Sequence, residues 1–349
     1  MPAEARGIVF TGPREVALET FEVADPGPHQ ALVRLRRTLV SAGTEVSTLL
    51  GQSRVVRWPA RPGYSNVGVV EQVGPGVEGL RPGDRVLCTG RHASHTLVTL
   101  DPQQWLALGH GTVEQLERAP QYAQPIPDGV SDDQAAFAVL GSVALHGARK
   151  APFQLGESCA VVGQGVVGQL LGQLALASGA RPVIGIDLVA SRLEMSRKSG
   201  LHQVVDASRQ DVEAAVFDLT HGRGADVVFE ATRSPRGFPT ALHVAALGGR
   251  VVMVGSVHAM GELHLFDDLQ RKELTIIGAW QPRAPVRSHQ QYRWTQTANR
   301  QLFMEQVRDG IIRVDHLITH RARPEDAPAL YAEMAAAPGD WLGVLFVWE

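Results

Sequence analysis

Three glycines stand at the spacing of a phosphate-binding turn. They are Gly163, Gly165 and Gly168. An apolar run over Ser158–Val162 precedes them and predicts a strand, and an amphipathic stretch over Gln164–Ser178 follows and predicts a helix. In such a unit the first glycine permits the tight turn, the second lets the backbone approach a diphosphate, and the third allows close helix–strand packing. The pattern predicts a dinucleotide site; the alternative is a glycine turn that binds no nucleotide.

The first turn of that helix, at Val166 and Val167, would offer unpaired backbone N–H groups and a partial positive charge to the phosphates. Asp187 ends the next predicted strand. A carboxylate there accepts hydrogen bonds from both ribose hydroxyls and repels a 2′-phosphate, which favours NAD over NADP. Arg192 could still reach the ribose, so NADP remains the less favoured alternative.

Composition narrows the function classes. The chain has 349 residues, more than one hydrophobic core usually organises, which predicts two domains. Its net charge of -3 gives no general attraction to nucleic acid or to anionic membranes. Two cysteines exclude a disulfide framework and a four-cysteine zinc site. No secretory signal or membrane-spanning run is present, so we expect a cytoplasmic protein with a small-molecule substrate.

The strand and helix patterns predict an α/β fold in two parts. Short apolar runs separated by Gly/Pro turns fill the first part and suit a small barrel or sandwich. The strands expected there are Gly7–Phe10, Ala31–Leu35, Val67–Val73, Asp84–Leu87 and Thr96–Leu100. Ser131–Asp133 would cap a helix over Gln134–Lys150, and strands and helices then alternate as in a doubly wound parallel sheet. After Trp280 the pattern changes again and ends with a strand at Gly343–Trp348.

Beyond these motifs, the chain resembles the medium-chain dehydrogenase/reductases over essentially its whole length. The segment Gly68–Val86, GVVEQVGPGVEGLRPGDRV, is similar to that family's GroES-like catalytic domain. The segments Asp226–Glu230 and Gly248–Gly255 are similar to its Rossmann half. The resemblance implies a GroES-like domain over residues 1–140 and 280–349 and a Rossmann NAD-binding domain over 141–279.

The resemblance also implies cofactor contacts at Glu230 and Gly255, and a homodimer or homotetramer with the edge strand around Gly249–Ile277 as a possible subunit contact. Two short strings, Ser41–Glu45 and Pro62–Tyr64, are similar to a narrower branch. That branch holds sorbitol-dehydrogenase-like proteins and 2-desacetyl-2-hydroxyethyl bacteriochlorophyllide dehydrogenases. The strings are too short to assign a substrate.

The chain departs from this family where zinc members hold their catalytic metal. The three ligand positions are occupied by Ala42, Tyr64 and Leu140. Alanine and leucine cannot coordinate zinc, and a neutral tyrosine is a poor ligand. The loop that carries a structural zinc in other members holds one cysteine here, not four. We therefore predict a zinc-free member with no bound metal.

Without zinc, hydride transfer needs another donor to the developing oxyanion, or a base for the hydroxyl proton. The phenol of Tyr64 is one candidate; alternatively it only fills the vacated metal space. Thr44 aligns with the hydroxyl residue that relays the substrate proton, or else caps a helix or strand end. Glu45 aligns with an acid that orients a zinc ligand. It is either the base or, more simply, half of a buried ion pair with an arginine of the C-terminal segment.

His92 and His95 stand at the entry to the strand expected over Thr96–Leu100. They either line the active-site mouth as proton relay or substrate contacts, with His95 the stronger catalytic candidate, or are solvated loop residues. His146 falls where the family contacts the nicotinamide, and packing explains it equally well. An aromatic and basic cluster follows the last Rossmann strand: Trp280, Arg283, Arg287, His289, Tyr292 and Trp294. It suits recognition of a polar or anionic substrate, or a subunit contact, better than nucleic acid.

Three functions are compatible with these residues. The first is an NAD-dependent, zinc-independent dehydrogenase that interconverts a secondary alcohol and a ketone of a hydroxylated small molecule. The second is an enone or quinone C=C reductase, which usually prefers NADPH and fits Asp187 less well. The third is a nucleotide-binding protein that lost catalysis together with the metal.

Overall fold

The computed structural model describes residues 3–52, 56–100, 121–256, 263–285, 293–336 and 339–348. The chain forms two compact units. Unit 1 comprises Met1–Val139, Pro285–Arg308 and Ile318–Glu349, and unit 2 comprises Leu140–Ala284 and Asp309–Leu317. The expected α/β class is confirmed. No helix in the described ranges is long and apolar enough to cross a bilayer.

Unit 1 contains a β-hairpin, a larger sheet and short helices. The hairpin pairs β1 (Ala3–Gly12) with β2 (Glu15–Val23). The sheet has the order β14 (Ile318–Ala322), β15 (Gly343–Val347), β3 (Gln30–Leu39), β4 (Asn66–Val73), β5 (Arg85–Cys88) and β7 (Ala123–Pro125), and β6 (His95–Thr99) also pairs with β3. Strands from both ends of the chain therefore lie in one sheet, with β15 antiparallel to β3.

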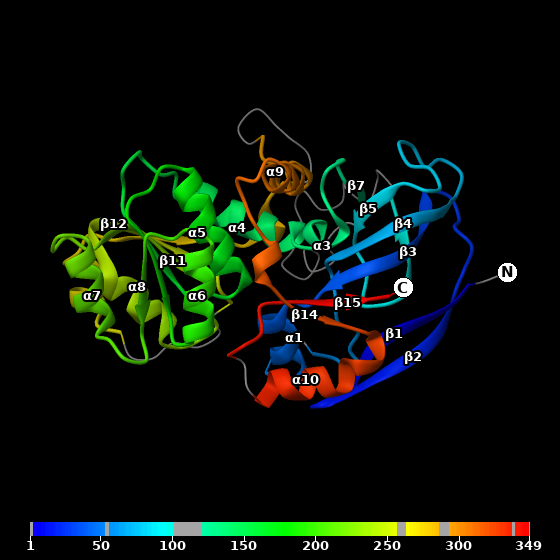
Figure 1. Cartoon of the computed structure of the whole chain (residues 1–349), viewed down its shortest axis with the longest axis horizontal. Helices are drawn as coiled ribbons and strands as arrows, with labels where there is room; N and C mark the ends of the chain where they lie inside the picture. The colour runs from blue at the N-terminus through cyan, green and yellow to red at the C-terminus, as the bar shows by residue number, and fades with distance from the viewer. Residues whose placement is uncertain are drawn as a thin grey trace. The chain divides into compact units, whose positions relative to one another are not determined.

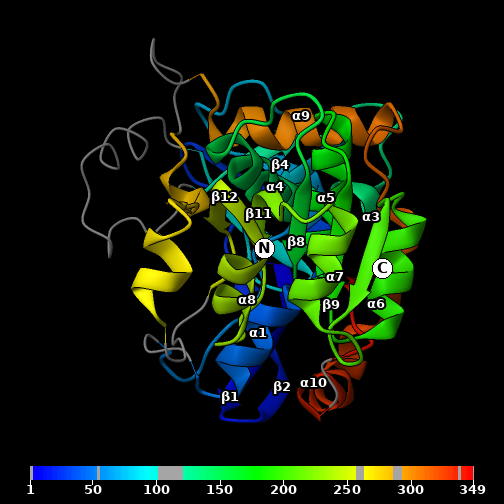
Figure 2. The same ribbon diagram turned by 90° about the vertical axis from the view of Figure 1, so that its left-hand side faces the viewer.

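Two helices of unit 1 share a core with the hairpin. Both α1 (Ala42–Leu49) and α10 (Ala327–Ala336) lie near β2, as Figures 1 and 2 show. The fully buried rings of Phe10 and Tyr331 meet edge to face, with their centroids 5.0 Å apart. The C-terminal helix is thus packed onto the first strand of the chain.

Unit 2 is a doubly wound parallel sheet. Its strand order is β10 (Gln203–Asp206), β9 (Val183–Asp187), β8 (Cys159–Val162), β11 (Ala225–Glu230), β12 (Ala245–Met253) and β13 (Thr275–Gly278). The labels β12, β11, β8 and β9 can be followed in that order in Figure 2. The connecting helices are α4 (Ala138–Lys150), α5 (Val166–Ala177), α6 (Ala190–Lys198), α7 (Val212–Leu219) and α8 (Gly237–Val244). Every residue of β8 is buried, because helices cover both faces of such a sheet.

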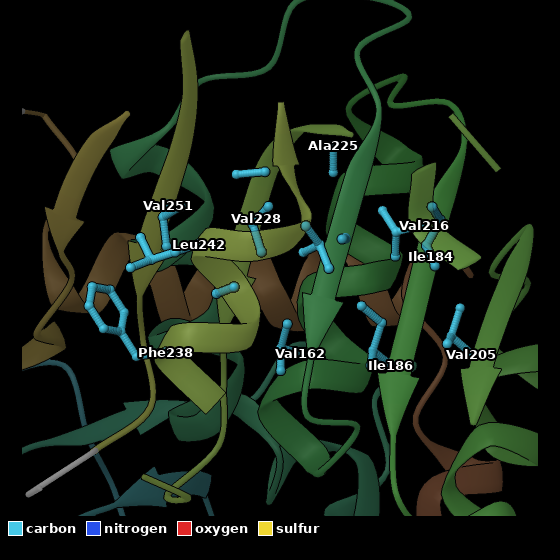
Figure 3. Packing of buried hydrophobic residues seen from close by; sticks show 14 residues of the cluster. Val162, Ile184, Ile186, Val205, Val216, Ala225, Val228, Phe238, Leu242 and Val251 are labelled. Atoms are coloured by element: carbon cyan, nitrogen blue, oxygen red, sulfur yellow. The ribbon is translucent and has the colours of Figure 1, made fainter. Parts of the chain in front are cut away.

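One side of this sheet forms an apolar core with the helices packed on it (Figure 3). Residues of β8, β9, β10, β11 and β12 supply the sheet side, and residues of α7 and α8 supply the helix side. Phe238 and Leu242 of α8 lie beside Val251 of β12 in this core. Because the strands are parallel, their carboxyl ends all lie at the same edge of the sheet, which is where α/β sheets bind ligands.

The structure corrects several element predictions. The helix expected over Gln134–Lys150 is two helices, α3 (Asp132–Ala135) and α4, although Ser131 does form the predicted cap with Gln134. At the break between the two helices, the hydroxyl of Ser65 donates to the carbonyl oxygen of Ala136 at 2.6 Å. The sequence patterns also missed β2, α1 and α8.

Candidate functional site

The glycine turn has the geometry that its spacing predicts. Gly163 has φ +94°, a left-handed conformation that favours glycine. A Cβ on Gly168 would lie 1.8 Å from the carbonyl oxygen of Gly163, so a side chain there would force α5 away from β8. A Cβ on Gly165 would meet nothing within 4 Å, and no side chain caps α5. The helix N-terminus is therefore left open to a ligand, with the N–H groups of Val166 and Val167 in its first turn.

Asp187 lies at the carboxyl end of β9 beside this turn. Its Oδ2 accepts the N–H of Gln164 at 2.7 Å, and its Oδ1 accepts the N–H of Val189 at 2.9 Å. The guanidinium of Arg192 lies 3.8 Å from Oδ2. The acid thus holds the glycine turn in place, and each carboxylate oxygen keeps a second lone pair for another donor.

Glu230 lies at the carboxyl end of β11 and is fully buried. Its Oε1 accepts the backbone N–H of Thr232 at 2.8 Å and also its hydroxyl, whereas Oε2 has no partner among the described residues. Burial raises the pKa of this carboxyl, and the bonds from Thr232 lower it by less. A Cβ on Gly255 would come within 2.6 Å of Oε2. Glu230 therefore packs beneath Gly255 and is not exposed.

A cavity of about 470 Å³ opens in unit 2 at the carboxyl ends of β12 and β13. We call it the strand-end cavity. It is lined by residues of α4 and by the segments that follow the two strands, among them His146, Lys150, Gly255, Ser256, Trp280 and Arg283. Trp280 and Arg283 belong to the predicted aromatic and basic cluster, of which Arg287, His289 and Tyr292 lie outside the described residues. Trp294 stacks under the guanidinium of Arg293, 4.2 Å from its ring centroid.

Glu45 occupies the centre of a buried polar network in unit 1. Its Oε1 accepts the N–H of Ser41 at 2.8 Å. Its Oε2 accepts the phenol of Tyr331 and, at 3.0 Å, the Nε2–H of His92. Only 3% of Glu45 is exposed, so this acid does not meet solvent. The expected arginine partner from the C-terminal segment is wrong: the partner from that segment is a tyrosine.

His92 extends the network toward the end of the chain. Its Nδ1 lies 2.7 Å from the hydroxyl oxygen of Thr38, which also accepts the indole N–H of Trp348 at 3.0 Å. His92 is fully buried, so both positions expected for it, an active-site mouth and a solvated loop, are wrong. The network joins β3, α1, α10 and the residue after β15.

The network sets the pKa of its ionisable members. Burial raises the pKa of Glu45, but the charge and hydrogen bond of His92 outweigh it, together with bonds from Tyr331 and Ser41, and the pKa is lowered. Burial and the neighbouring carboxylate raise the pKa of Tyr331 well above its ordinary value. The network therefore holds a carboxylate and a phenol rather than a phenolate.

The other catalytic candidates occupy different surroundings. Thr44 is exposed within the first turn of α1; the helix cap position is Ser41, so the capping interpretation of Thr44 is wrong. Tyr64 is half-buried and follows Gly63, where a Cβ would lie 2.5 Å from the backbone nitrogen of His92. The segment that carries Tyr64 thus packs directly against the buried network.

His95 begins β6 on the surface of the sheet. Its Nε2 lies 3.5 Å from a carboxylate oxygen of Glu71, which also pairs with Arg34 at 2.9 Å. The pKa of His95 is lowered, because burial and the charge of Arg34 together outweigh the charge of Glu71, which raises it. In the described chain, the side-chain hydrogen bond and ion pair of His95 are with Ser94 and Glu71, and not with the other catalytic candidates.

The donor groups do not fit a catalytic zinc. The methyl group of Ala42 and the buried isobutyl group of Leu140 are not metal ligands. In the described ranges no three His, Cys, Asp or Glu side chains gather as a metal site would need. The two cysteines are buried in different units, and burial raises the pKa of each thiol, which disfavours the thiolate that zinc requires.

Comparison with known proteins identifies the family to which this fold belongs. Residues 27–128 match the family model for the alcohol dehydrogenase GroES-like domain, and residues 166–298 match that for zinc-binding dehydrogenase. An alcohol dehydrogenase of Cupriavidus necator is 30% identical over 73% of this chain and 77% of its own length. The chain belongs to the medium-chain dehydrogenase/reductases. It is an oxidoreductase of the alcohol dehydrogenase-like kind, with a GroES-like domain and a Rossmann domain.

Two further proteins extend the comparison over nearly the whole length of this chain. The 2-desacetyl-2-hydroxyethyl bacteriochlorophyllide A dehydrogenase of Cereibacter sphaeroides is 24% identical over 98% of both chains. The structure of a proposed zinc-binding dehydrogenase from Sinorhizobium meliloti 1021, bound to NADP, superposes with a TM-score of 0.77 over 99% of both chains at 22% identity. The resemblance to the superfamily is thus confirmed. Its members normally bind zinc, so the zinc independence of this chain remains a prediction.

Proposed function

We propose that this chain is an NAD-dependent, zinc-independent oxidoreductase. Its reaction is hydride transfer between the nicotinamide and a secondary alcohol or ketone of a hydroxylated small molecule. The observation that carries the proposal is the glycine turn: its helix N-terminus is open, and Asp187 is hydrogen-bonded to the turn itself. When bound, the nucleotide supplies the hydride acceptor or donor.

The surroundings of Asp187 support NAD. Its carboxylate places a negative charge where a 2′-phosphate would lie and retains lone pairs for ribose hydroxyls. Arg192 near Asp187 is the specific observation in favour of NADP as the alternative, because a guanidinium can pair with a phosphate. Gly163, Gly165, Val166, Val167 and Gly168 would hold the diphosphate, and Gly255 would border the nicotinamide end with Glu230 as its buried support.

At the substrate, we assign the proton chemistry to Tyr64 and Thr44. A phenol can donate to a carbonyl oxygen, or take the proton of an alcohol if its pKa is lowered. The exposed hydroxyl of Thr44 is free of a capping role and suits a substrate contact. Glu45 is a positioning residue, because it is buried and fixes the first turn of α1 through Ser41. His95 remains a candidate for a peripheral substrate contact.

The assignment of a function to each domain follows the family models. We propose that residues 1–140 and 280–349 form the catalytic domain and that residues 141–279 bind the nucleotide. The GroES-like match at 27–128 lies within the first range and supports this assignment, and most of the match at 166–298 lies within the second.

Turnover and metal content together test the proposal. Purified protein is assayed with NAD and NADP on a panel of polyols and secondary alcohols, and with NADPH on enones, before and after chelation. We expect alcohol oxidation with NAD at a rate that chelation does not change, and less than one zinc per chain by elemental analysis. Stoichiometric zinc with activity lost on chelation would refute zinc independence. Enone reduction alone, or nucleotide binding without turnover, would refute the dehydrogenase assignment.

A further inference from the structure

A connected set of polar side chains is buried beneath the glycine turn of unit 2. Gln169 of α5 is at its centre, and the residues bonded to it come from the turn, from α6 and the residue after it, and from the segment before β14. We call the set the buried polar chain; its members are Gln164, Ser196, Gln169, Ser199 and His316. The first four are at most 4% exposed. Burying polar groups costs free energy unless all of them are hydrogen-bonded, so the bonds within this set decide what it can do.

On one side of Gln169 the hydrogen bonds run toward the glycine turn. Its Nε2 donates to Oγ of Ser196 at 2.9 Å. The hydroxyl of Ser196 donates to Oε1 of Gln164 at 2.9 Å, and Nε2 of Gln164 donates to the carbonyl oxygen of Val161 at 2.8 Å. The amide of Gln164, the residue between the first two glycines of the turn, is therefore held at both of its ends.

On the other side of Gln169 the bonds arrive from His316. The hydroxyl of Ser199 donates to Oε1 of Gln169 at 3.1 Å. Because a serine hydroxyl has one hydrogen, Nε2 of His316, 2.8 Å from the same oxygen, is the donor of their bond. Each member then donates to the next in one direction. A fully satisfied buried network of this kind fixes a single arrangement of the groups that it joins.

The buried polar chain holds both residues to which we assign the choice between NAD and NADP. The backbone N–H of Gln164 donates to Oδ2 of Asp187 at 2.7 Å, so a fixed Gln164 also fixes that donor. The carbonyl oxygen of Arg192, in the first turn of α6, accepts Nε2 of Gln169 at 2.9 Å. One side chain, Gln169, thus connects the backbone that holds the acid with the backbone that carries the guanidinium.

The strand that ends in Asp187 leaves room for this arrangement. Within β9, a Cβ on Gly185 would lie 3.1 Å from Cδ of Gln164 and 3.0 Å from a methyl carbon of Leu201. The amide of Gln164 therefore packs directly against β9, two residues before the acid.

We propose that Gln169 is a positioning residue that sets the preference between NAD and NADP. It is fully buried and so acts through Asp187 and Arg192 rather than on the nucleotide. The chain keeps the guanidinium of Arg192 3.8 Å from the carboxylate, where it faces the acid and not a 2′-phosphate. This inference rests on the proposed function for the roles of Asp187 and Arg192. The hydrogen bonds that hold the two residues do not depend on turnover.

Titration of the full chain with NAD and with NADP by calorimetry tests the proposal. Gln169→Met keeps the length of the side chain and removes its donors and its acceptor. With the acid and the guanidinium no longer held, we expect the dissociation constant for NADP divided by that for NAD to fall at least about fivefold. Ser196→Ala removes a single hydroxyl of the chain, so it disturbs folding less and should shift the ratio in the same direction. A ratio that neither variant changes would overturn the proposal.

Gln173→Met is the matched control. Gln173 lies one turn further along α5, is 3% exposed, and exchanges two hydrogen bonds with the backbone of Arg313. Its replacement therefore removes an equally buried amide from the same helix without touching the buried polar chain. The melting temperature should fall about as much as in Gln169→Met, while the ratio stays at the parent value. Equal shifts of the ratio in both variants would show a general loosening of unit 2 and would overturn the positioning role.

The route through Asp187 and Arg192 is tested by a double-mutant cycle. In the Asp187→Ala/Arg192→Gln background, Gln169→Met should change the ratio by less than about twofold, because the two residues that it positions are gone. The full change in that background would show that Gln169 acts by another route.

Hydrogen exchange of the nucleotide-free protein separates a failure of this inference from a failure of the proposed function. The N–H groups of Gln164 and Val189 both donate to Asp187, so their exchange rates report whether the carboxylate is held. Gln169→Met should raise both rates at least about tenfold, and Gln173→Met should not. If the protein bound neither nucleotide, the proposed function would be wrong, yet faster exchange in Gln169→Met alone would still support the positioning of Asp187. Unchanged exchange would overturn it.

Discussion

Glu45 and Glu230 are both buried carboxylates, and their surroundings shift their pKa values in opposite directions. The charge and hydrogen bond of His92, together with the donors Tyr331 and Ser41, outweigh the desolvation of Glu45 and lower its pKa. Glu230 has two donors from one threonine and an oxygen with no partner among the described residues, so burial prevails and its pKa is raised. A neighbouring charge and the donors that reach the acid, and not burial alone, therefore set the direction in which its pKa shifts.

The phenol of Tyr331 should contribute measurably to stability. Tyr331→Phe removes a donor to a buried carboxylate and should lower the free energy of unfolding by about 1.5–3 kcal/mol near pH 7. Because the folded pKa of Glu45 lies below its unfolded value of 4.5, this stabilisation is present above about pH 4.5 and is lost as pH falls through the folded pKa. Urea unfolding at pH 7 and below pH 4 measures both effects.

Tyr122 supplies the control for that measurement. It too is buried, but its hydroxyl has no partner in the described part of the chain. Tyr122→Phe should therefore leave stability unchanged or slightly raised, since an unsatisfied hydroxyl is removed. Equal losses for the two variants would show that removal of a buried hydroxyl in general, and not loss of the bond to Glu45, explains the effect of Tyr331→Phe.

Tyr64→Phe tests the assigned proton chemistry. If the phenol donates to or accepts from the substrate oxygen, kcat should fall by about 10²-fold or more. The melting temperature and the affinity for NAD should stay near those of the parent protein. An unchanged kcat would show that Tyr64 only packs against its neighbours, and Thr44 would then be the remaining candidate for the proton chemistry.

Asp187→Ala should weaken NAD binding far more than NADP binding. The change also removes the acceptor for the N–H groups of Gln164 and Val189, so both affinities will fall to some extent. The ratio of the two dissociation constants is therefore the measured quantity. Arg192→Gln is the counterpart and should weaken NADP more than NAD. A ratio that Asp187→Ala leaves unchanged would contradict the assignment of NAD.

At the scale of elements, the glycines of the turn have separable roles. Gly168 lets α5 cross β8 closely, because a Cβ there would overlap the backbone of Gly163. Gly165 has open space where its side chain would be. The first is required by packing inside the protein, whereas the second is required only by what approaches from outside.

Two alanine substitutions should show this difference. Gly168→Ala should destabilise unit 2 by about 1–3 kcal/mol, since backbone cannot yield as a side-chain end can. Gly165→Ala should keep the melting temperature within error and still weaken NAD binding at least about tenfold by crowding the diphosphate. Thermal unfolding and nucleotide titration of both variants measure the two effects. Stable Gly168→Ala protein would contradict the packing argument.

At the scale of the whole molecule, β13 is an edge strand of the unit 2 sheet in the described part of the chain, and its Ile276 is 39% exposed. A strand edge with no neighbour among the described residues and an exposed apolar side chain is a surface on which a second copy of the chain could continue the sheet. This agrees with the expected homodimer or homotetramer.

The mass in solution tests that expectation. Light scattering after gel filtration should give a multiple of 37.6 kDa. Ile276→Glu should shift the mass toward the monomer, because it places a charge on the edge strand. Leu155→Glu alters a side chain in unit 2 that is 90% exposed and lies away from that strand, and should leave the mass unchanged. A monomeric parent protein would remove β13 as a subunit contact.

The sequence by itself determined the parts of this protein whose chemistry is local. The glycine turn, Asp187 at the end of the next strand and the alternation of strands and helices are each encoded within a few tens of residues, so spacing and periodicity predict them. The missing metal ligands could also be found by position, since a residue type alone shows that Ala42 cannot bind zinc.

Only the tertiary structure decided the partners of the buried acid and the cavity. Tyr331 lies 286 positions from Glu45, and His92 lies 47 positions from it. No periodic pattern connects residues at such separations, because packing of α10 and β15 against the first strands brings them together. The same holds for His146, which is buried in the wall of the strand-end cavity because α4 and the segment after β13 meet in space, and spacing along the chain does not encode that meeting.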